Sequence, residues 1–180
     1  EKECENGYKG ILFPIVQGNF FEDLRQQSAQ FVDSLDMPGI AIGGLSVGET
    51  PEEFKHFLNH TVKFLSEDKP KYVMGIGTPE YILDAVQAGI DMFDCVLPTR
   101  NARNGSYFTH RGMLSIKQER WIHDFGPVDS ECKCKVCQTY SKAYLRHLFK
   151  EQEILSSILA SYHNLYFLHN MIKEIRFAID

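Results

Sequence analysis

The chain has 180 residues, enough for one compact domain with a hydrophobic core, and its 43% hydrophobic and 24% charged content is typical of globular proteins. No apolar run approaches the ~20 residues that cross a bilayer, and residues 1–5 (EKECE) lack the apolar core of a signal peptide. Five cysteines, three of them within six residues, favour a metal site in a reducing compartment over disulfides, so we expect the cytoplasm.

Charge is unevenly distributed along the chain. The net charge of −5 argues against indiscriminate nucleic-acid binding. Residues 1–98 carry 7 basic and 16 acidic groups, whereas residues 99–150 carry 10 basic and 4 acidic groups. A basic middle on an acidic chain indicates either a local footprint for phosphates or an ordinary solvated surface, and charge alone favours the second.

The first half alternates short apolar runs with amphipathic stretches. Four runs flanked by Gly or Pro predict buried parallel strands at 11–17, 39–43, 71–76 and 92–97. Thr50, Pro51 and Glu53 predict a capped helix between the second and third runs, and Thr78-Pro79 predicts another after the third. The first helix is expected to bury the face formed by Phe21, Leu24, Ser28, Phe31, Val32 and Leu35.

This β-α-β-α-β-α-β order predicts parallel strands with right-handed crossovers. Four such strands form either a small doubly wound sheet or half of a (β/α)8 barrel, and periodicity does not separate the two. After residue 97, we expect two short strands around Arg111-Gly112, then a helical region over 140–179 with a break near 161–164. The predicted domains are 1–104 and 105–180.

The cysteine cluster is a strong metal signal. Cys132, Cys134 and Cys137 place three thiolates on one tight loop, and a closed tetrahedral zinc site needs one more ligand. His147, His163 and His169 are all candidates for that ligand by sequence. Four protein ligands would make the ion structural rather than catalytic.

Asp94 lies inside the fourth predicted strand, which is otherwise apolar. A buried carboxylate is costly unless it is hydrogen-bonded or used in chemistry, and the sequence supports a structural and a functional role about equally. Arg100 and Arg103 follow at the carboxyl end of that strand, where parallel α/β folds bind ligands and where guanidinium groups suit phosphate. The glycine-rich turns at 43–49 and 75–79 lack a dinucleotide fingerprint, and each is read as a tight turn.

Together these motifs resemble the C-terminal part of the tRNA-guanine transglycosylases, also called queuine tRNA-ribosyltransferases. The string at 91–105 (DMFDCVLPTRNARNG) is the most specific match. The other matching segments are Val16-Gln17-Gly18, 43–49 (GGLSVGE), 74–77 (MGIG), the cysteine cluster and Tyr162-His163-Asn164. The resemblance implies that His163 is the fourth zinc ligand, and that residues 1–104 are the C-terminal half of a (β/α)8 barrel followed by an appended zinc subdomain.

The resemblance also implies an activity, the exchange of guanine at the wobble position of tRNAs with a GUN anticodon for a queuosine precursor. Asp94 would be the nucleophile of a double displacement with retention. Gln17, Gly44 and Leu45 would hydrogen-bond the base, and Met74 would pack against its face. The RNA around a flipped nucleotide would be held by Gly75, Ile76, Gly77, Thr78, Pro79, Glu80, Tyr81, Thr99, Arg100, Asn101, Ala102 and Arg103.

Substrate and partners follow from the same resemblance. Bacterial relatives carry Val at the position of Val47 and eukaryotic ones Gly, so the base preQ1 is expected rather than queuine. The family's general acid/base and guanine-reading aspartates have no counterpart among these 180 residues. The chain therefore resembles a fragment, and we expect self-association or a second polypeptide, the N-terminal half of the same enzyme, to complete the barrel. Because bacterial relatives form homodimers partly through the zinc region, the resemblance also implies a homodimer.

Two other hypotheses remain. The chain could be a non-catalytic, zinc-stabilised RNA-binding module or partner subunit, which would have no need of a buried carboxylate at Asp94. It could also be a self-contained α/β protein that binds a phosphorylated small molecule at 75–79, independently of tRNA.

Overall fold

The computed structural model describes residues 10–179, which belong to two compact units, Glu1–Cys95 and Val96–Asp180. We call them the sheet unit and the helical unit. The division precedes helix α5 (Leu97–Arg103), because α5 packs along α8 (Ile154–Ile179) within the helical unit. The sequence placed α5 with the first domain.

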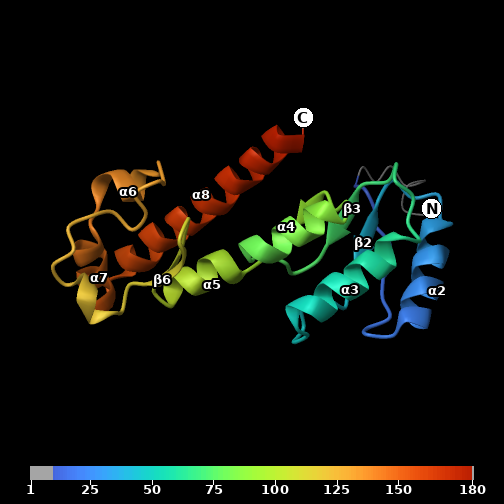
Figure 1. Ribbon diagram of the computed structural model, residues 1–180, viewed down its shortest axis with the longest axis horizontal. Helices are drawn as coiled ribbons and strands as arrows, with labels where there is room; N and C mark the ends of the chain where they lie inside the picture. The colour runs from blue at the N-terminus through green and yellow to red at the C-terminus, as the bar shows by residue number, and fades with distance from the viewer. Residues whose placement is uncertain (1–9, 180) are drawn as a thin grey trace. The chain divides into compact units, whose positions relative to one another are not determined.

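The sheet unit contains four parallel strands in the order β1 (Ile15–Val16), β2 (Ile40–Ile42), β3 (Lys71–Val73) and β4 (Met92–Phe93). All four predicted strands are present and parallel, and they are shorter than their apolar runs. Strand β2 is central and all three of its residues are buried, as expected for a strand covered on both faces. Consecutive strands are connected through α2 (Glu22–Asp33), α3 (Pro51–Val62) and α4 (Pro79–Gln87) (Figure 1).

The helix starts predicted at Thr50 and Thr78 are confirmed. Thr50 accepts a hydrogen bond from the Glu53 amide (3.2 Å), and the Glu53 carboxylate accepts one from the Thr50 amide (2.9 Å), so α3 has a complete capping box. These bonds hold the pKa of Glu53 below its usual value. The Thr78 hydroxyl caps α4 by accepting from the Tyr81 amide.

The predicted buried face of α2 is confirmed at Val32 and wrong at its three large residues before Val32. Phe21, Leu24 and Phe31 are exposed, whereas the helix buries Arg25, Ala29 and Val32. The physical reason is Arg25, whose guanidinium is satisfied inside the unit by several hydrogen bonds and therefore turns its own face of the helix inward.

The helical unit contains α5 and α8 together with β5 (Ser106–Thr109), β6 (Gly112–Ser115), η1 (Glu119–Trp121), α6 (Lys135–Thr139) and α7 (Lys142–Lys150). The predicted hairpin around Arg111-Gly112 is confirmed as the antiparallel pair β5–β6. The hydrophobic core of the helical unit includes residues of α5, the hairpin, the cysteine loop and α8. No helix in the described part of the chain is long and apolar enough to cross a membrane.

Two expectations for this unit are wrong. Leu97, the last residue of the strand predicted at 92–97, instead begins helix α5, and Pro98 in the first turn of that helix is the signal that was available. Helix α8 continues without interruption through 161–164, and the break between helices falls at 151–153, where Gln152 has φ +58°.

Candidate functional site

Asp94 lies immediately beyond β4 and is exposed, so the expectation that it is buried inside a strand is wrong. The strand ends at Phe93, four residues before the end of its apolar run at 97, which leaves the carboxylate at the carboxyl end of the sheet. Its Oδ1 atom accepts hydrogen bonds from the Tyr72 hydroxyl (2.5 Å) and the Gly75 amide (2.9 Å). The described residues give Oδ2 no hydrogen bond.

These two hydrogen bonds set the ionisation of the site. The Tyr72 hydroxyl, followed by the Gly75 amide, lowers the pKa of Asp94, and partial burial opposes them. The same hydrogen bond raises the pKa of Tyr72, which keeps its phenol a donor. The result is a carboxylate that is ionised at neutral pH, fixed through one oxygen and open at the other.

Both glycine-rich turns already hold a carboxylate. Glu49 accepts hydrogen bonds from the amides of Ser46, Val47 and Gly48, and Asp94 accepts from Gly75, whose φ of +75° suits glycine. Backbone amides that could cradle a phosphate are therefore occupied by side chains of the chain itself. This arrangement weakens the hypothesis of a phosphorylated small molecule at 75–79.

Residues expected to contact the base surround the ends of β1, β2 and β3. The Gln17 side chain lies over Gly43 and Gly44, so closely that a Cβ at Gly44 would stand 3.0 Å from Gln17 Oε1. Leu45 is buried, whereas Met74 and Val47 are exposed, Val47 at 70%. Gln17, Gly44 and Met74 therefore present groups at the same edge of the sheet as Asp94, because parallel strands end together there.

The expected RNA-binding residues form two segments, one in each unit. In the first, Gly75 and Glu80 are exposed, Ile76 is in the core, and Tyr81 stacks on Phe54 with ring centroids 4.4 Å apart. In the second, which is the body of α5, Arg100 and Arg103 are exposed and Ala102 is fully buried. The side chains of Ile76 and Ala102 therefore pack inside their units and do not face solvent.

Arg25 is a residue that sequence reasoning missed. It is fully buried, and it donates to the carbonyls of Asn19 (2.6 Å), Gly43 (2.9 Å) and Gly44 (3.2 Å), as well as to the Thr61 hydroxyl (3.2 Å). Burial lowers the pKa of Arg25, and the negative charge of Glu49 opposes that effect. Arg25 thus fixes the two loops that carry Gln17 and Gly44.

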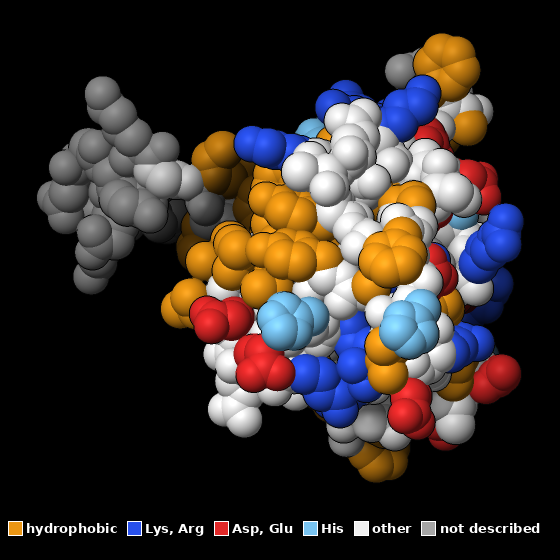
Figure 2. All heavy atoms as spheres, turned by 90° about the vertical axis from the view of Figure 1, so that its left-hand side faces the viewer, with side chains coloured by type: hydrophobic (Ala, Val, Ile, Leu, Met, Phe, Trp, Pro, Cys, Tyr) orange, Lys and Arg blue, Asp and Glu red, His pale blue; other side chains and the backbone are white. Residues whose placement is uncertain are grey.

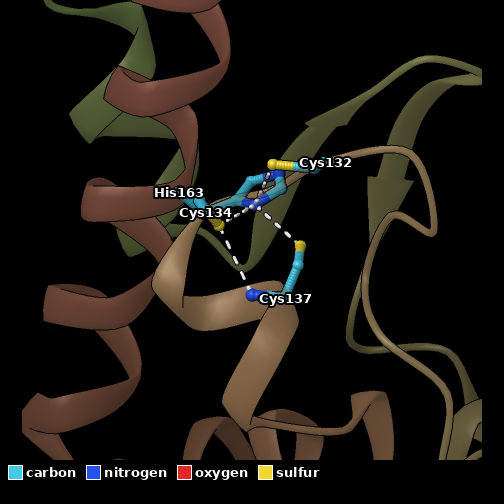
Figure 3. Close-up of side chains that lie close together, drawn as sticks. All are labelled: Cys132, Cys134, Cys137 and His163. Carbon is cyan, nitrogen blue, oxygen red and sulfur yellow. Dashed lines mark hydrogen bonds between the residues drawn. The ribbon is translucent and has the colours of Figure 1, made fainter.

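The second site is the predicted cluster of Cys132, Cys134, Cys137 and His163. Their ligand atoms all lie within 4.8 Å of one another, and this group could hold one metal ion. His163 Nδ1 is 3.9, 3.4 and 3.3 Å from the sulfurs of Cys132, Cys134 and Cys137. Figure 3 shows the imidazole reaching from α8 toward the three thiols of the loop and of α6.

Hydrogen bonds orient the histidine and tie α8 to the hairpin. His163 Nε2 lies 2.7 Å from the Phe108 carbonyl, which directs the proton to Nε2 and leaves the Nδ1 lone pair facing the sulfurs. The neighbouring Asn164 is also fully buried, accepting from the Phe108 amide (3.0 Å) and donating to the Pro98 (2.9 Å) and Ser106 (3.0 Å) carbonyls. Neither His147 nor His169 belongs to the cluster.

The three thiols differ in acidity. Hydrogen bonding from Cys137, and then from His163, lowers the pKa of Cys134 to about 4. Burial raises the pKa of Cys132 to about 11, and hydrogen bonding to Cys134 raises the pKa of Cys137. A metal ion bound here would displace the remaining thiol protons.

Comparison with known proteins matches these features to one family. The family model described as queuine tRNA-ribosyltransferase matches residues 1–180. Curated relatives of that name include the one from Treponema denticola, which is 59% identical over 96% of this chain and 46% of its own length. The relative from Caldanaerobacter subterraneus is 51% identical over 99% of this chain and 48% of its own length. The relative from Streptococcus pneumoniae is 54% identical over 93% and 44%.

The chain spans about half the length of the curated relatives it matches, and the matched part is their C-terminal half. The family match covers both units, including Asp94 and the cluster of three cysteines and one histidine. The chain therefore belongs to the queuine tRNA-ribosyltransferase family.

Proposed function

We propose that this chain is the nucleophile-bearing part of a tRNA-guanine transglycosylase, which exchanges guanine at the tRNA wobble position for preQ1. The observation that carries the proposal is the Asp94 carboxylate, held through Oδ1 at the carboxyl end of the sheet with Oδ2 open. Family membership supplies the reaction class.

In the proposed mechanism, Asp94 Oδ2 attacks C1′ of the ribose while the bond from C1′ to the guanine nitrogen breaks. Guanine leaves with the bonding electron pair, and the ribose is held as an ester of Asp94. The nitrogen of the incoming base then attacks C1′ and loses its proton, which balances the proton that the departed guanine takes up. The ester bond breaks, and the carboxylate is regenerated with overall retention. The lowered pKa of Asp94 suits both steps, because the group must attack and leave as a carboxylate.

The base would lie against the sheet edge described above. Gln17, whose side chain covers Gly43 and Gly44, is proposed to hydrogen-bond the base edge together with the backbone of Gly44 and Leu45. Exposed Met74 would pack against the base face, and Val47 would leave less room than glycine, which favours preQ1 over queuine. The tRNA would be held by residues 75–81 and by 99–103, chiefly through exposed Arg100 and Arg103.

The sheet unit is proposed to be half of a (β/α)8 barrel, completed by the N-terminal half of the same enzyme, and the enzyme is proposed to form a homodimer. Strands β1 and β4 are edge strands of the described sheet, and apolar side chains of α2 and of the segment before β1 are exposed: Ile11, Leu12, Phe21, Leu24 and Phe31. Unpaired strand edges beside apolar surface favour a covering partner.

The metal in the helical unit is proposed to be one structural zinc. For tetrahedral zinc, sulfur and nitrogen ligands at ordinary bond lengths lie about 3.6 Å apart, and the three sulfur–nitrogen distances of 3.3 to 3.9 Å bracket that value. Cys132, Cys134, Cys137 and His163 fill four positions, so the ion would pin the cysteine loop to α8 and bind no substrate.

The alternative is a non-catalytic, zinc-stabilised RNA-binding module or partner subunit. It uses the same cluster and the same basic residues, and it differs in having no role for Asp94. A carboxylate with one oxygen held and the other open has no evident use in such a module, so the enzyme is the better proposal.

The test is incorporation of labelled guanine into unmodified tRNA by this chain, alone and with the N-terminal half added. We expect the complete enzyme to incorporate label and Asp94→Ala to abolish incorporation. Asp68→Ala, at an exposed acidic residue that precedes β3 and so lies toward the amino ends of the strands, opposite Asp94, is the matched control and should retain full activity. Incorporation that persists in Asp94→Ala would overturn the mechanism, and tRNA binding without incorporation by the complete wild type would favour the binding module.

A further inference from the structure

One feature of the helical unit is not used by either site. Lys142, Arg146 and Lys150 recur at every fourth residue of α7, which places them along one side of the helix. Lys117 lies just before η1 and Arg120 lies within it, and η1 packs against α7. We call these five residues the cationic strip.

Aromatic rings and carbonyls hold the strip in place. Lys117 Nζ lies 5.4 Å from the centroid of the Phe149 ring, and the Arg120 guanidinium and Lys142 Nζ lie 4.2 and 5.0 Å from that of Trp121. Arg146 Nε donates to the Gln118 carbonyl (3.0 Å). These contacts pre-position Lys117, Arg120 and Arg146 without an ion pair among the described residues, so less entropy is lost when an anion binds. Lys142 is held in addition by its ion pair with Asp124.

Few acidic groups offset the strip. Asp124 pairs with Lys142 at 2.7 Å, Glu119 lies beside Arg120 in η1, and exposed Glu151 follows Lys150 at the end of α7. Lys117, Arg120, Arg146 and Lys150 have no ion pair among the described residues. Figure 2 looks onto the α6–α7 end of the helical unit, where several blue side chains gather below the centre of the face. In a chain of net charge −5, this is a local concentration of cations.

We propose that the cationic strip binds the phosphate backbone of the RNA, away from the exchanged nucleotide. This inference rests on the proposed function for its partner. Lysine and arginine side chains held along one surface match a row of phosphates and carry no base readout, so the contact would be independent of RNA sequence. The opposite side of α7 packs Leu145 and Leu148 into the core, which leaves this helix no apolar face to insert into a lipid surface.

The experiment measures binding of unmodified tRNA to the 180-residue chain as a function of salt concentration. The triple variant Lys117→Gln, Arg120→Gln, Lys150→Gln removes three charges and leaves Lys142 and Arg146 with their structural partners. Each phosphate contact contributes about 0.9 to the slope of log K against log salt, so the slope should become less steep by about 2 to 3. The charge-preserving variant Lys117→Arg, Arg120→Lys, Lys150→Arg should keep the wild-type slope.

A charge-matched control neutralises three exposed cations outside the strip, Lys63, Lys173 and Arg176, and should leave the slope within one of wild type. Far-ultraviolet circular dichroism checks that the strip variant is folded, because Trp121 emission would respond to the loss of the Arg120 guanidinium over its ring. The proposal that the strip binds RNA would be overturned if the slope fell equally in the control and strip variants, or if it did not change in the strip variant. Either result would leave the proposed function intact. If the wild-type chain bound no tRNA, RNA would be excluded as the partner of the strip. Binding to phosphatidylserine vesicles that depends on the strip would then assign it to a membrane surface.

Discussion

The Asp94 site and the cysteine–histidine cluster are built in opposite ways. Asp94 is exposed, and its carboxylate is held through one oxygen. That oxygen accepts from the Tyr72 hydroxyl on the adjacent strand β3 and from the Gly75 amide in the turn after β3. In the cluster, Cys134 and His163 are completely buried, and the histidine is fixed by a backbone carbonyl on its far nitrogen. A nucleophile must remain accessible to its substrate, whereas a structural metal site gains from the exclusion of water.

Each site also depends on its own scaffold. The bonds that hold Asp94 come from β3 and the turn after it, inside the sheet unit. The bonds that hold the cluster come from α6, the cysteine loop, β5 and α8, inside the helical unit. We therefore expect damage to one scaffold to spare the other site, and the following experiments try to break that independence.

The largest effect should come from removing the proposed zinc ion. Chelation, or Cys134→Ser, deletes an interaction on the order of 10 kcal/mol in apparent binding free energy. The helical unit should then lose its cooperative unfolding transition, followed by Trp121 emission. Hydrogen exchange of the β2 and β3 amides in the sheet unit should stay as slow as in the loaded chain.

Cys95→Ser is the matched control, because Cys95 belongs to the sheet unit and is not a member of the cluster. It should bind the metal as the wild type does, judged by the thiolate-to-metal absorption of the cobalt-substituted chain. An unchanged Trp121 transition after chelation would contradict a structural role for the metal.

The sequence was sufficient to predict the parts of both sites that rest on local rules. The three cysteines lie within one loop, and the Thr50 capping box and the β5–β6 hairpin depend on neighbours in the chain. The fourth ligand was not predictable by spacing, because His163 is 26 residues from Cys137 and three histidines lay in range. Only the family resemblance distinguished it, and the structure brings His163 alone to the thiols.

Long-range hydrogen bonds explain the errors. The polar residues near 161–164 resemble a helix break in the sequence. His163 and Asn164 are nevertheless buried within α8, because their polar groups form hydrogen bonds with residues some 55 to 66 positions away in the chain. Arg25 reversed the expected face of α2 for the same reason, since its acceptors lie beyond the helix. Hydrophobic periodicity contains no information about such partners.

An intermediate effect is expected from Arg25→Met. Loss of the guanidinium leaves the carbonyls of Asn19, Gly43 and Gly44 without their donor, which should cost about 2–4 kcal/mol. Hydrogen exchange of amides in β1 and β2 should accelerate, while the Trp121 transition of the helical unit stays unchanged. Gln27→Met, at an exposed position of the same helix, should alter neither, and a comparable acceleration there would show that α2 responds to any substitution.

The smallest effect, and the most specific, is expected from Tyr72→Phe. The variant removes the hydroxyl that donates to Asp94 Oδ1 and keeps the Gly75 amide, so the pKa of Asp94 should rise toward its ordinary value of about 3.9 without reaching it. Titration of the Asp94 carboxyl carbon by NMR measures this directly. Tyr81→Phe, which leaves Asp94 untouched, is the matched control.

The sign of the stability effect follows from the same shift. A carboxylate whose pKa is lowered by folding stabilises the protein above its unfolded pKa, and that contribution is lost as pH falls through the folded pKa. The difference in unfolding free energy between wild type and Tyr72→Phe should therefore be present at neutral pH and shrink below about pH 4. Because Asp94 is exposed, this difference in unfolding free energy should not exceed about 1 kcal/mol. An Asp94 pKa that is identical in both proteins would mean that Tyr72 holds the carboxylate in position without tuning its charge, and the open oxygen would then be the only property of the site that matters for attack.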